Sequence, residues 1–186
     1  MRLDLDTLTP LDWQVLQQAR LKALLDAPHA FISSFAIERR WRENEWRQLF
    51  NAARWIVARE ADEVIGLARS VAESEHGERY IESIWVAPAH RRRGVLRALL
   101  CALAQMERHM GATDLLLWVL EDNCDALRAY KAVGFEATGE RQYLPALGRF
   151  EQQLRLGVRL LLESEIRRTP LRSQLPHRQT QLVSRS

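Results

Sequence analysis

The residues best suited to chemistry lie between Tyr80 and Gly139. The segment Ile81–Val86 is typical of a strand, and it is followed by Arg91-Arg92-Arg93-Gly94 and a long helical pattern. A tight turn that leads into a helix leaves several main-chain N–H groups unpaired, and such a helix start can bind a pyrophosphate. An arginine run alone more often indicates a solvated surface, but its place between a strand and a helix favours phosphate binding.

The elements that position this stretch alternate between strands and helices. Gly94–Met110 carries leucines along one helical face, and Leu115–Leu120 has the near-continuous apolar character of a strand covered on both sides. A helix from Asn123 to Gly134 follows. The order strand, helix, strand predicts a right-handed crossover between parallel strands. Further strands are expected at residues 3–5, 55–59, 64–71, 80–86, 136–140 and 150–156, and further helices at residues 9–25 and 41–50.

Charge is distributed unevenly along the 186 residues. The formal net charge is +3, but residues 157–186 alone carry six arginines and two glutamates, so residues 1–156 are slightly acidic. A nucleic-acid-binding domain needs a basic face on the folded part, so we expect no nucleic-acid partner. From about Glu163 the chain is rich in Arg, Ser, Gln and Pro, which is typical of disorder. We predict one folded domain at residues 1–160 and a basic, disordered tail at residues 161–186.

Several other classes of protein are disfavoured by composition. Cys101 and Cys124 lack the spacing of metal ligands, so we expect no metal and two reduced thiols, as is usual in the cytoplasm. No apolar run approaches the roughly 18 residues of a membrane span. The first residues alternate charge and leucine, unlike a secretory signal. We therefore expect a cytoplasmic protein without a membrane partner, and a homodimer stays open.

Two segments resemble the signatures of the GNAT superfamily of N-acetyltransferases. Val86–Leu100 is similar to the acetyl-CoA motif, Arg/Gln-x-x-Gly-x-Gly/Ala before a leucine-rich helix. Asn123–Phe135 resembles the second signature, Asn-x-x-Ala-x-x-x-Tyr-x-x-x-Gly-Phe, and Ala27–Phe31 resembles one bacterial branch. The resemblance covers residues 1–156. It implies an α/β fold, the GNAT fold, with a central mixed, twisted β-sheet of about six to seven strands flanked by about four helices.

The same resemblance implies roles for individual residues. Tyr130 would be the general acid toward the departing sulfur of CoA. Asn123 would contact the pantetheine arm or order a water, and it also fits a plain helix N-cap. Main-chain groups of Ile84 and Val86 would pair with the pantetheine amides as an added strand does. The expected acetyl-CoA contacts are Ile84, Trp85, Val86, Arg91, Arg92, Arg93, Gly94, Val95, Leu96, Arg97, Asn123 and Tyr130.

The sequence departs from the family pattern at two positions. Leu96 stands where most relatives have Gly or Ala, and the i, i+3, i+4 pattern that begins there favours burial of its side chain. Many relatives place a glutamate at the position of Tyr80, whereas the nearest carboxylate here is Glu82. Residues two apart on a strand share a face about 6.6 Å apart, so Glu82 is the candidate base, although a charged edge residue is the alternative. Trp85 is expected on the opposite face, as packing.

The implied reaction is transfer of an acetyl group from acetyl-CoA to a primary amine, by direct attack of the amine on the thioester. The acceptor is a small molecule or a protein amino group. The resemblance implies Phe31 and Ser34 as candidate acceptor contacts, because the loop from Pro28 to Ser34 lies where relatives build the acceptor pocket. An alternative is a CoA-binding regulatory module that no longer catalyses. A third hypothesis is association with nucleic acid through the arginine-rich tail, which would depend steeply on salt.

Overall fold

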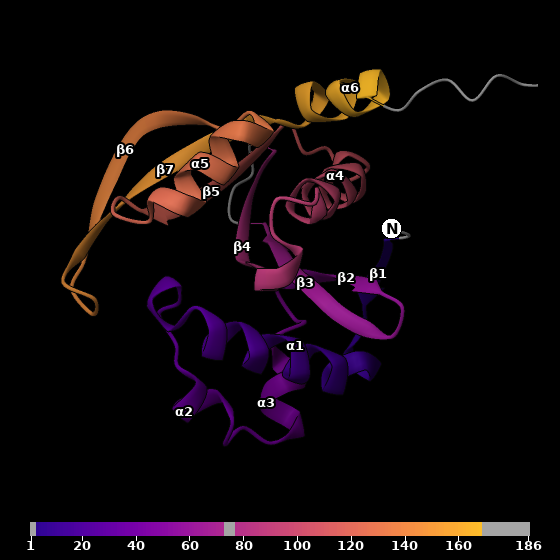
Figure 1. Ribbon diagram of the computed structural model, residues 1–186, viewed down its shortest axis with the longest axis vertical. Helices are drawn as coiled ribbons and strands as arrows, with labels where there is room; N and C mark the ends of the chain where they lie inside the picture. The colour runs from indigo at the N-terminus through magenta and orange to yellow at the C-terminus, as the bar shows by residue number, and fades with distance from the viewer. Residues whose placement is uncertain (1–2, 73–76, 169–186) are drawn as a thin grey trace, which may run out of the picture.

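A seven-stranded mixed β-sheet forms the centre of the protein, in the order β1-β2-β3-β4-β5-β7-β6 (Figure 1). The computed structural model describes residues 3–72 and 77–168. Neighbouring strands run antiparallel except β4 and β5, which are parallel. The strands are β1 Asp4–Leu8, β2 Ala53–Glu60, β3 Glu63–Val71, β4 Glu78–Val86, β5 Asp114–Leu120, β6 Glu136–Leu144 and β7 Arg149–Gly157.

Helices cover both faces of this sheet. Two apolar clusters result, one between the sheet and α4, α5 and α6, the other between the sheet and α1 and α3. Figure 1 shows α1, α2 and α3 on one side and α4 and α6 on the other. The helices are α1 Trp13–Asp26, α2 Phe35–Glu38, α3 Glu43–Gln48, α4 Val95–Arg108, α5 Cys124–Val133 and α6 Val158–Arg168.

Local signals in the sequence account for most of these elements. Thr9 caps the first helical turn, because its Oγ1 accepts a hydrogen bond from the Leu11 N–H at 3.3 Å. The apolar faces of α4 and β5 pack in one cluster, with Leu99 and Leu115 fully buried. The predicted parallel pairing is confirmed, since β4 and β5 run parallel and α4 lies between them in the chain.

The sheet agrees with the predicted six to seven strands, but the described residues form six α-helices rather than about four. The additional helices are α2, a single turn after Ser34, and α6. Their sequences explain why they were missed. The first is only four residues long, and the second lies in a stretch that the prediction assigned to the tail.

The expected domain boundary at residue 160 falls inside α6, so the folded part extends at least to Arg168. Leu161 and Leu162 are buried in the apolar cluster between the sheet and α4, α5 and α6, called the α4-side cluster below. Apolar residues at 158, 160–162 and 166 have helical spacing, which the surrounding charges obscured. The rest of the predicted tail, residues 169–186, lies outside the described residues.

Candidate active site

The strand β4 contains a bulge at its centre. Leu67 of β3 pairs with Trp85, but Arg69, two residues further along β3, pairs with Glu82, three residues back on β4. Ser83, within the extra length, has a φ of 53°, in the left-handed region. Bulges of this kind re-aim side chains and interrupt the hydrogen-bond ladder.

The bulge changes which residues of β4 share a face. Ile81 and Ile84 both pack in the α4-side cluster, although they are three residues apart. Glu82 and Ser83 both turn toward the α1 side, where they contact Arg69 and Arg20. Trp85 packs on that side as well. The prediction that Trp85 lies opposite Glu82 was therefore wrong, because a regular strand has no extra residue.

The sheet opens between β4 and β5. The two strands pair only over Glu78–Tyr80 and Asp114–Leu116. At the far end of the opening, the Ala87 N–H donates to the Ile65 carbonyl of β3 at 2.8 Å. Successive N–H groups of a strand point to alternate sides, so the Val86 and Ile84 N–H groups point away from β3, toward the opening. Its β4 edge thus presents main-chain hydrogen-bonding groups that no strand of the described chain pairs with.

The N-terminus of α4 lies where β4 ends. Among the described residues, the main-chain N–H groups of residues 92–97 have no acceptor, and the first helical bond runs from Ala98 N to Gly94 O at 3.0 Å. Gly94 has a φ of 86°, and Arg92 before it has a φ of 61°. Unpaired N–H groups at the start of a 14-residue helix form a site for an anion. These N–H groups of residues 92–97, called the cradle below, lie where the sequence predicts pyrophosphate binding, and that role stays a prediction.

The arginine side chains around this cradle are mostly engaged within the protein. Arg91 donates to the Val86 carbonyl at 3.0 Å and pairs with Asp26, which also accepts from the Trp85 indole. Arg97 donates to Glu165 at 2.7 Å, and Arg93 pairs with Glu60 at 3.5 Å. Arg92 has no ion pair with any described residue, so its guanidinium is the one most available to a phosphate.

Val95 and Leu96, in the first turn of α4, contribute their side chains to the core. Val95 is buried, and Leu96 packs half-buried against the same α4-side cluster. Their N–H groups remain without acceptors in the described part of the chain. The expectation that the Leu96 side chain turns toward the core is confirmed.

The helix α5 carries the second signature. Asn123 is its N-cap, because its Oδ1 accepts from the Ala126 N–H at 3.2 Å. Tyr130 is half-buried and packs edge-on against Phe135, with ring centroids 5.8 Å apart. Burial raises the pKa of the Tyr130 phenol above its ordinary value. No described residue hydrogen-bonds its hydroxyl.

Glu82, the candidate base, is engaged by Arg69. The guanidinium donates through both Nε and Nη2 to Oε2, with an Nε–Oε2 distance of 2.9 Å. Arg69 itself stacks over the Trp55 ring at 5.2 Å. The second carboxylate oxygen, Oε1, has no donor among the described residues. The Oε2 atom is therefore fixed by Arg69, and the Oε1 atom remains available to accept a proton or a hydrogen bond.

The two candidate acceptor residues occupy different environments. Phe31 is buried in the α1-side cluster, and its ring lies 5.1 Å from the Arg20 guanidinium. Ser34 is exposed and precedes α2, without capping it through its side chain. The structure brings neither beside Tyr130 through any described contact, and both remain predictions.

A cavity of about 270 Å³ lies at the carboxyl end of β5. Its wall combines the end of α1 and the following turn with the start of α5 and Arg149 of β7. Asp26 and Asp122 line it, and each receives its arginine through Oδ2, leaving Oδ1 without a donor in the described chain. The lining residues are Asp26, Ala27, Pro28, His29, Ala30, Leu120, Asp122, Asn123 and Arg149.

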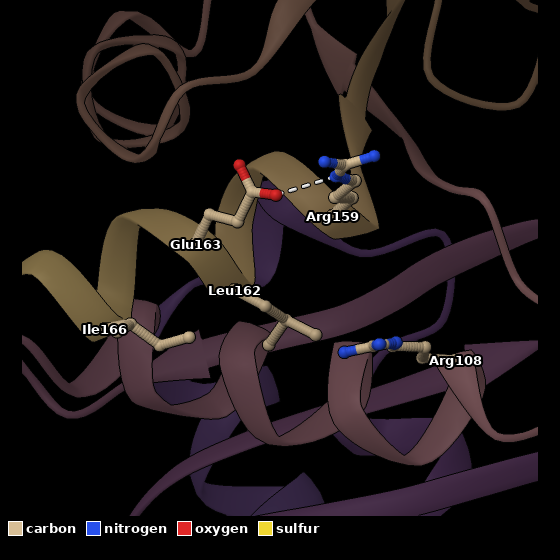
Figure 2. A pocket seen from close by; sticks show the side chains of 5 residues that line it. All are labelled: Arg108, Arg159, Leu162, Glu163 and Ile166. Carbon is tan, nitrogen blue, oxygen red and sulfur yellow. Dashed lines mark hydrogen bonds and ion pairs between the residues drawn. The ribbon is translucent and has the colours of Figure 1, made fainter.

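A second groove, of about 390 Å³, lies between α4 and α6, at the opposite end of α4 from the cradle (Figure 2). Its lining residues are Arg108, Arg159, Leu162, Glu163 and Ile166. Arg159 and Glu163 form an ion pair, drawn as a dashed line in Figure 2. Its Nε–Oε1 distance is 2.6 Å. We assign no part of the chemistry to this groove.

Within residues 3–72 and 77–168, no group of three or more His, Cys, Asp or Glu side chains could hold a metal ion. None of the helices in the same ranges combines the length and apolar character needed to cross a bilayer.

Two residues that sequence reasoning missed are Arg20 and Glu38, which meet beneath β4. They are 18 positions apart, and no motif in the sequence marks the pair.

Comparison with known sequences identifies relatives over much of the chain. A family model described as the acetyltransferase (GNAT) family matches residues 17–135. Streptothricin acetyltransferase from Streptomyces lavendulae is 38% identical over 88 residues, which are 47% of this chain and 47% of that protein. The chain spans about a third to a half of the length of the curated relatives it matches.

Solved structures share the fold at low sequence identity. Spermidine N-acetyltransferase from Vibrio cholerae, in complex with CoA and spermine, has a TM-score of 0.66 at 19% identity, over 86% of this chain and 98% of that one. The ribosomal-protein-S18-alanine N-acetyltransferase from Escherichia coli has a TM-score of 0.61 at 17% identity, over 84% and 94%. With its family match over residues 17–135 and this fold, the chain belongs to the acetyltransferase (GNAT) family.

Proposed function

We propose that this protein transfers the acetyl group of acetyl-CoA to a primary amine. The observation that carries the proposal is the junction of two main-chain features of the described chain. These are the stretch of β4 beyond Tyr80, which no longer pairs with β5, and the N–H groups of residues 92–97, which have no acceptor. An extended, amide-containing arm beside a pyrophosphate fits this junction. Bound acetyl-CoA supplies an activated acetyl group as a thioester.

The cradle and the strand edge divide the binding between them. The N–H groups of residues 92–97 hold the pyrophosphate, with the helix dipole of α4 behind them. Arg92 adds a charged donor. The carbonyl of Ile84 and the N–H of Val86 pair with the pantetheine amides, as in β-strand addition. These contacts fix the thioester beside the opening, which supplies the proximity that acyl transfer needs.

Tyr130 acts as the general acid. Its raised pKa keeps the phenol protonated at neutral and mildly alkaline pH, so it has a proton to give to the departing sulfur. The lack of a competing hydrogen bond within the described chain leaves the hydroxyl free to make that contact. Asn123 keeps the start of α5 in place by capping it.

Glu82 acts as the base, directly or through a water. A lysine-type amine with a pKa near about 10.4 is mostly charged at neutral pH and must lose a proton before it attacks. The Oε1 atom of Glu82 has no donor in the described chain and can take that proton. Arg69 fixes the carboxylate through Oε2.

The acceptor is a small molecule that carries a cationic amine, bound in the cavity lined by Asp26 and Asp122. Their free Oδ1 atoms offer acceptors to an ammonium group. Relatives act on such compounds, as streptothricin acetyltransferase and spermidine N-acetyltransferase do by their names. A protein amino group is the competing acceptor. Two reduced cysteines, as expected for Cys101 and Cys124, fit a cytoplasmic location.

The test combines cofactor binding with acetyl transfer. We expect acetyl-CoA to raise the melting temperature by ligand linkage, and CoA alone to do nearly the same. Polyamines, streptothricin-like amines and peptides with free N-termini are then screened for release of CoA thiol. Tyr130→Phe is expected to lower kcat about 10²–10⁴-fold without weakening acetyl-CoA binding.

Each outcome of this experiment distinguishes between hypotheses. Absence of a thermal shift at millimolar acetyl-CoA would contradict cofactor binding. Binding without thiol release across the panel would favour the CoA-binding regulatory module over the enzyme. Release with peptides alone would replace the small amine by a protein amino group. Unchanged turnover in Tyr130→Phe would remove Tyr130 from the mechanism.

A further inference from the structure

A buried ion pair lies beneath β4 on the α1 side. Arg20 of α1 donates through Nε to Oε2 of Glu38 at 2.9 Å, and through Nη2 to Oε1 at 2.8 Å. The Glu38 side chain has no exposed surface, and that of Arg20 is 12% exposed. Burying a charge is unfavourable unless it is paired and hydrogen-bonded. This pair therefore meets that condition in bidentate geometry.

The third nitrogen of the same guanidinium reaches the bulge. Nη1 of Arg20 donates to Oγ of Ser83 at 2.7 Å. Ser83 holds the positive φ in β4, a conformation that a residue with a Cβ keeps only where its surroundings enforce it. The Phe31 ring lies against the guanidinium at 5.1 Å. Arg20 thus joins α1, α2, the turn after α1 and the centre of β4.

The site described above depends on the shape of the bulge. The Ser83–Ile84 segment falls where the β3–β4 register shifts, so the β3 ladder does not by itself fix its direction. The next residue, Trp85, is again in register with Leu67. Between these points the bulge sets where the Ile84 N–H points, and that N–H faces the opening between β4 and β5.

We propose that Arg20 is a positioning residue for acetyl transfer. Held rigid by Glu38, it fixes Ser83, and Ser83 fixes the bulge that aims the Ile84 N–H at the carbonyl oxygen of the bound acetyl group. Arg20 contacts neither substrate. A planar guanidinium with three committed nitrogens suits this task, because its fork has one orientation. The inference rests on the proposed acetyltransferase function.

Two sets of variants test the proposal. Ser83→Gly removes the hydroxyl and relieves the left-handed backbone, so the fold should be as stable as the wild type while the bulge becomes mobile. The double variant Arg20→Met/Glu38→Leu replaces the buried pair by apolar side chains, which is often neutral or stabilising. The control is Ser70→Ala on the neighbouring strand β3. It removes a different hydrogen bond from a serine to a carboxylate, the one from Ser70 to Glu107 of α4.

We measure amide hydrogen exchange in the free protein at Ile81, Glu82 and Trp85, the residues of β4 that pair with β3 on either side of the bulge. We also measure the melting temperature, CoA affinity and kcat. In Ser83→Gly and in the double variant, exchange across β4 should accelerate at least tenfold. Their kcat should fall roughly tenfold to a hundredfold, because small misplacements have effects of that size, while their melting temperatures hold. Ser70→Ala should lower the melting temperature and leave kcat unchanged.

The proposal is overturned if exchange and kcat of both test variants equal those of the wild type, or if kcat falls only in proportion to lost stability. A wild-type protein that binds no CoA would contradict the proposed function instead. The exchange measurement would still report whether Arg20 fixes the bulge at Ser83, because it needs no ligand.

Discussion

Arg97 of α4 donates through Nε to Glu165 of α6 at 2.7 Å, and so joins the helix that begins at the cradle to the last described helix. Arg97 also reaches Ser164 of α6 and the Val133 carbonyl at the end of α5. Arg97 is expected to contact the cofactor through its main-chain N–H, and its side chain instead joins α4 to α5 and α6. Its N–H remains available at the first turn of α4.

The helix α6 is expected to contribute substantially to stability. Truncation after residue 160 removes the buried Leu161 and Leu162, and each leucine contributes about 1.5–3 kcal/mol by burial. We expect a lowered melting temperature in calorimetry, whereas truncation after Arg168 should leave it unchanged. Equal melting temperatures for the two truncations would show that α6 adds nothing.

The glycines at the two ends of α4 allow a matched test of the cradle. Gly94 and Gly111 have φ values of 86° and 82°, and an added Cβ would meet no described atom within 4 Å at either position. Alanine at either should therefore cost about 1–2 kcal/mol of backbone strain. Only Gly94→Ala should weaken CoA binding, measured by calorimetric titration. Equal affinity of both variants would argue against a pyrophosphate at residues 92–97.

Leu96 is expected to matter for the fold more than for the cofactor. Its side chain packs against the α4-side cluster, so Leu96→Gly loses burial and adds a helix penalty of about 1 kcal/mol. Chemical denaturation should show the destabilisation, with CoA affinity little changed. A tenfold gain in affinity at full stability would mean instead that the leucine crowds the phosphates.

Tyr130 should make stability sensitive to alkaline pH. Burial raises its pKa above the ordinary value of 10.0, so the folded state binds the proton more tightly than the unfolded state. The resulting stabilisation is complete below about pH 10 and is lost progressively as the pH rises further. Tyr130→Phe should show a shallower loss of unfolding free energy above pH 10. A slope equal to that of the wild type in Tyr130→Phe would contradict this role of Tyr130.

The order of the elements and the location of the cradle could be predicted because their signals are local. Gly94 before a leucine-rich helix, and Asn123 with Tyr130 and Gly134, lie within single turns or helices. Such patterns depend on near neighbours in the chain. The packing of Leu96 against the core followed from the same kind of reasoning and is confirmed.

The remaining features depend on contacts between distant segments. Arg20 and Ser83 are separated by 63 positions, and Arg97 and Glu165 by 68, so no spacing in the sequence reveals either pair. The bulge at Ser83 was missed for a related reason. Serine has no preference for a positive φ, and the conformation is imposed by the strand register and by Arg20.

The open edge of β4 also affects which amino-acid substitutions the proposed cofactor site can tolerate. Main-chain N–H and C=O groups are the same in every amino acid except proline, so a contact made through them survives the exchange of almost any side chain. What must persist is the path of the backbone, set by a few residues such as Gly94 and Ser83. A binding site formed by main-chain groups can therefore be common to related proteins that have few amino acids in common.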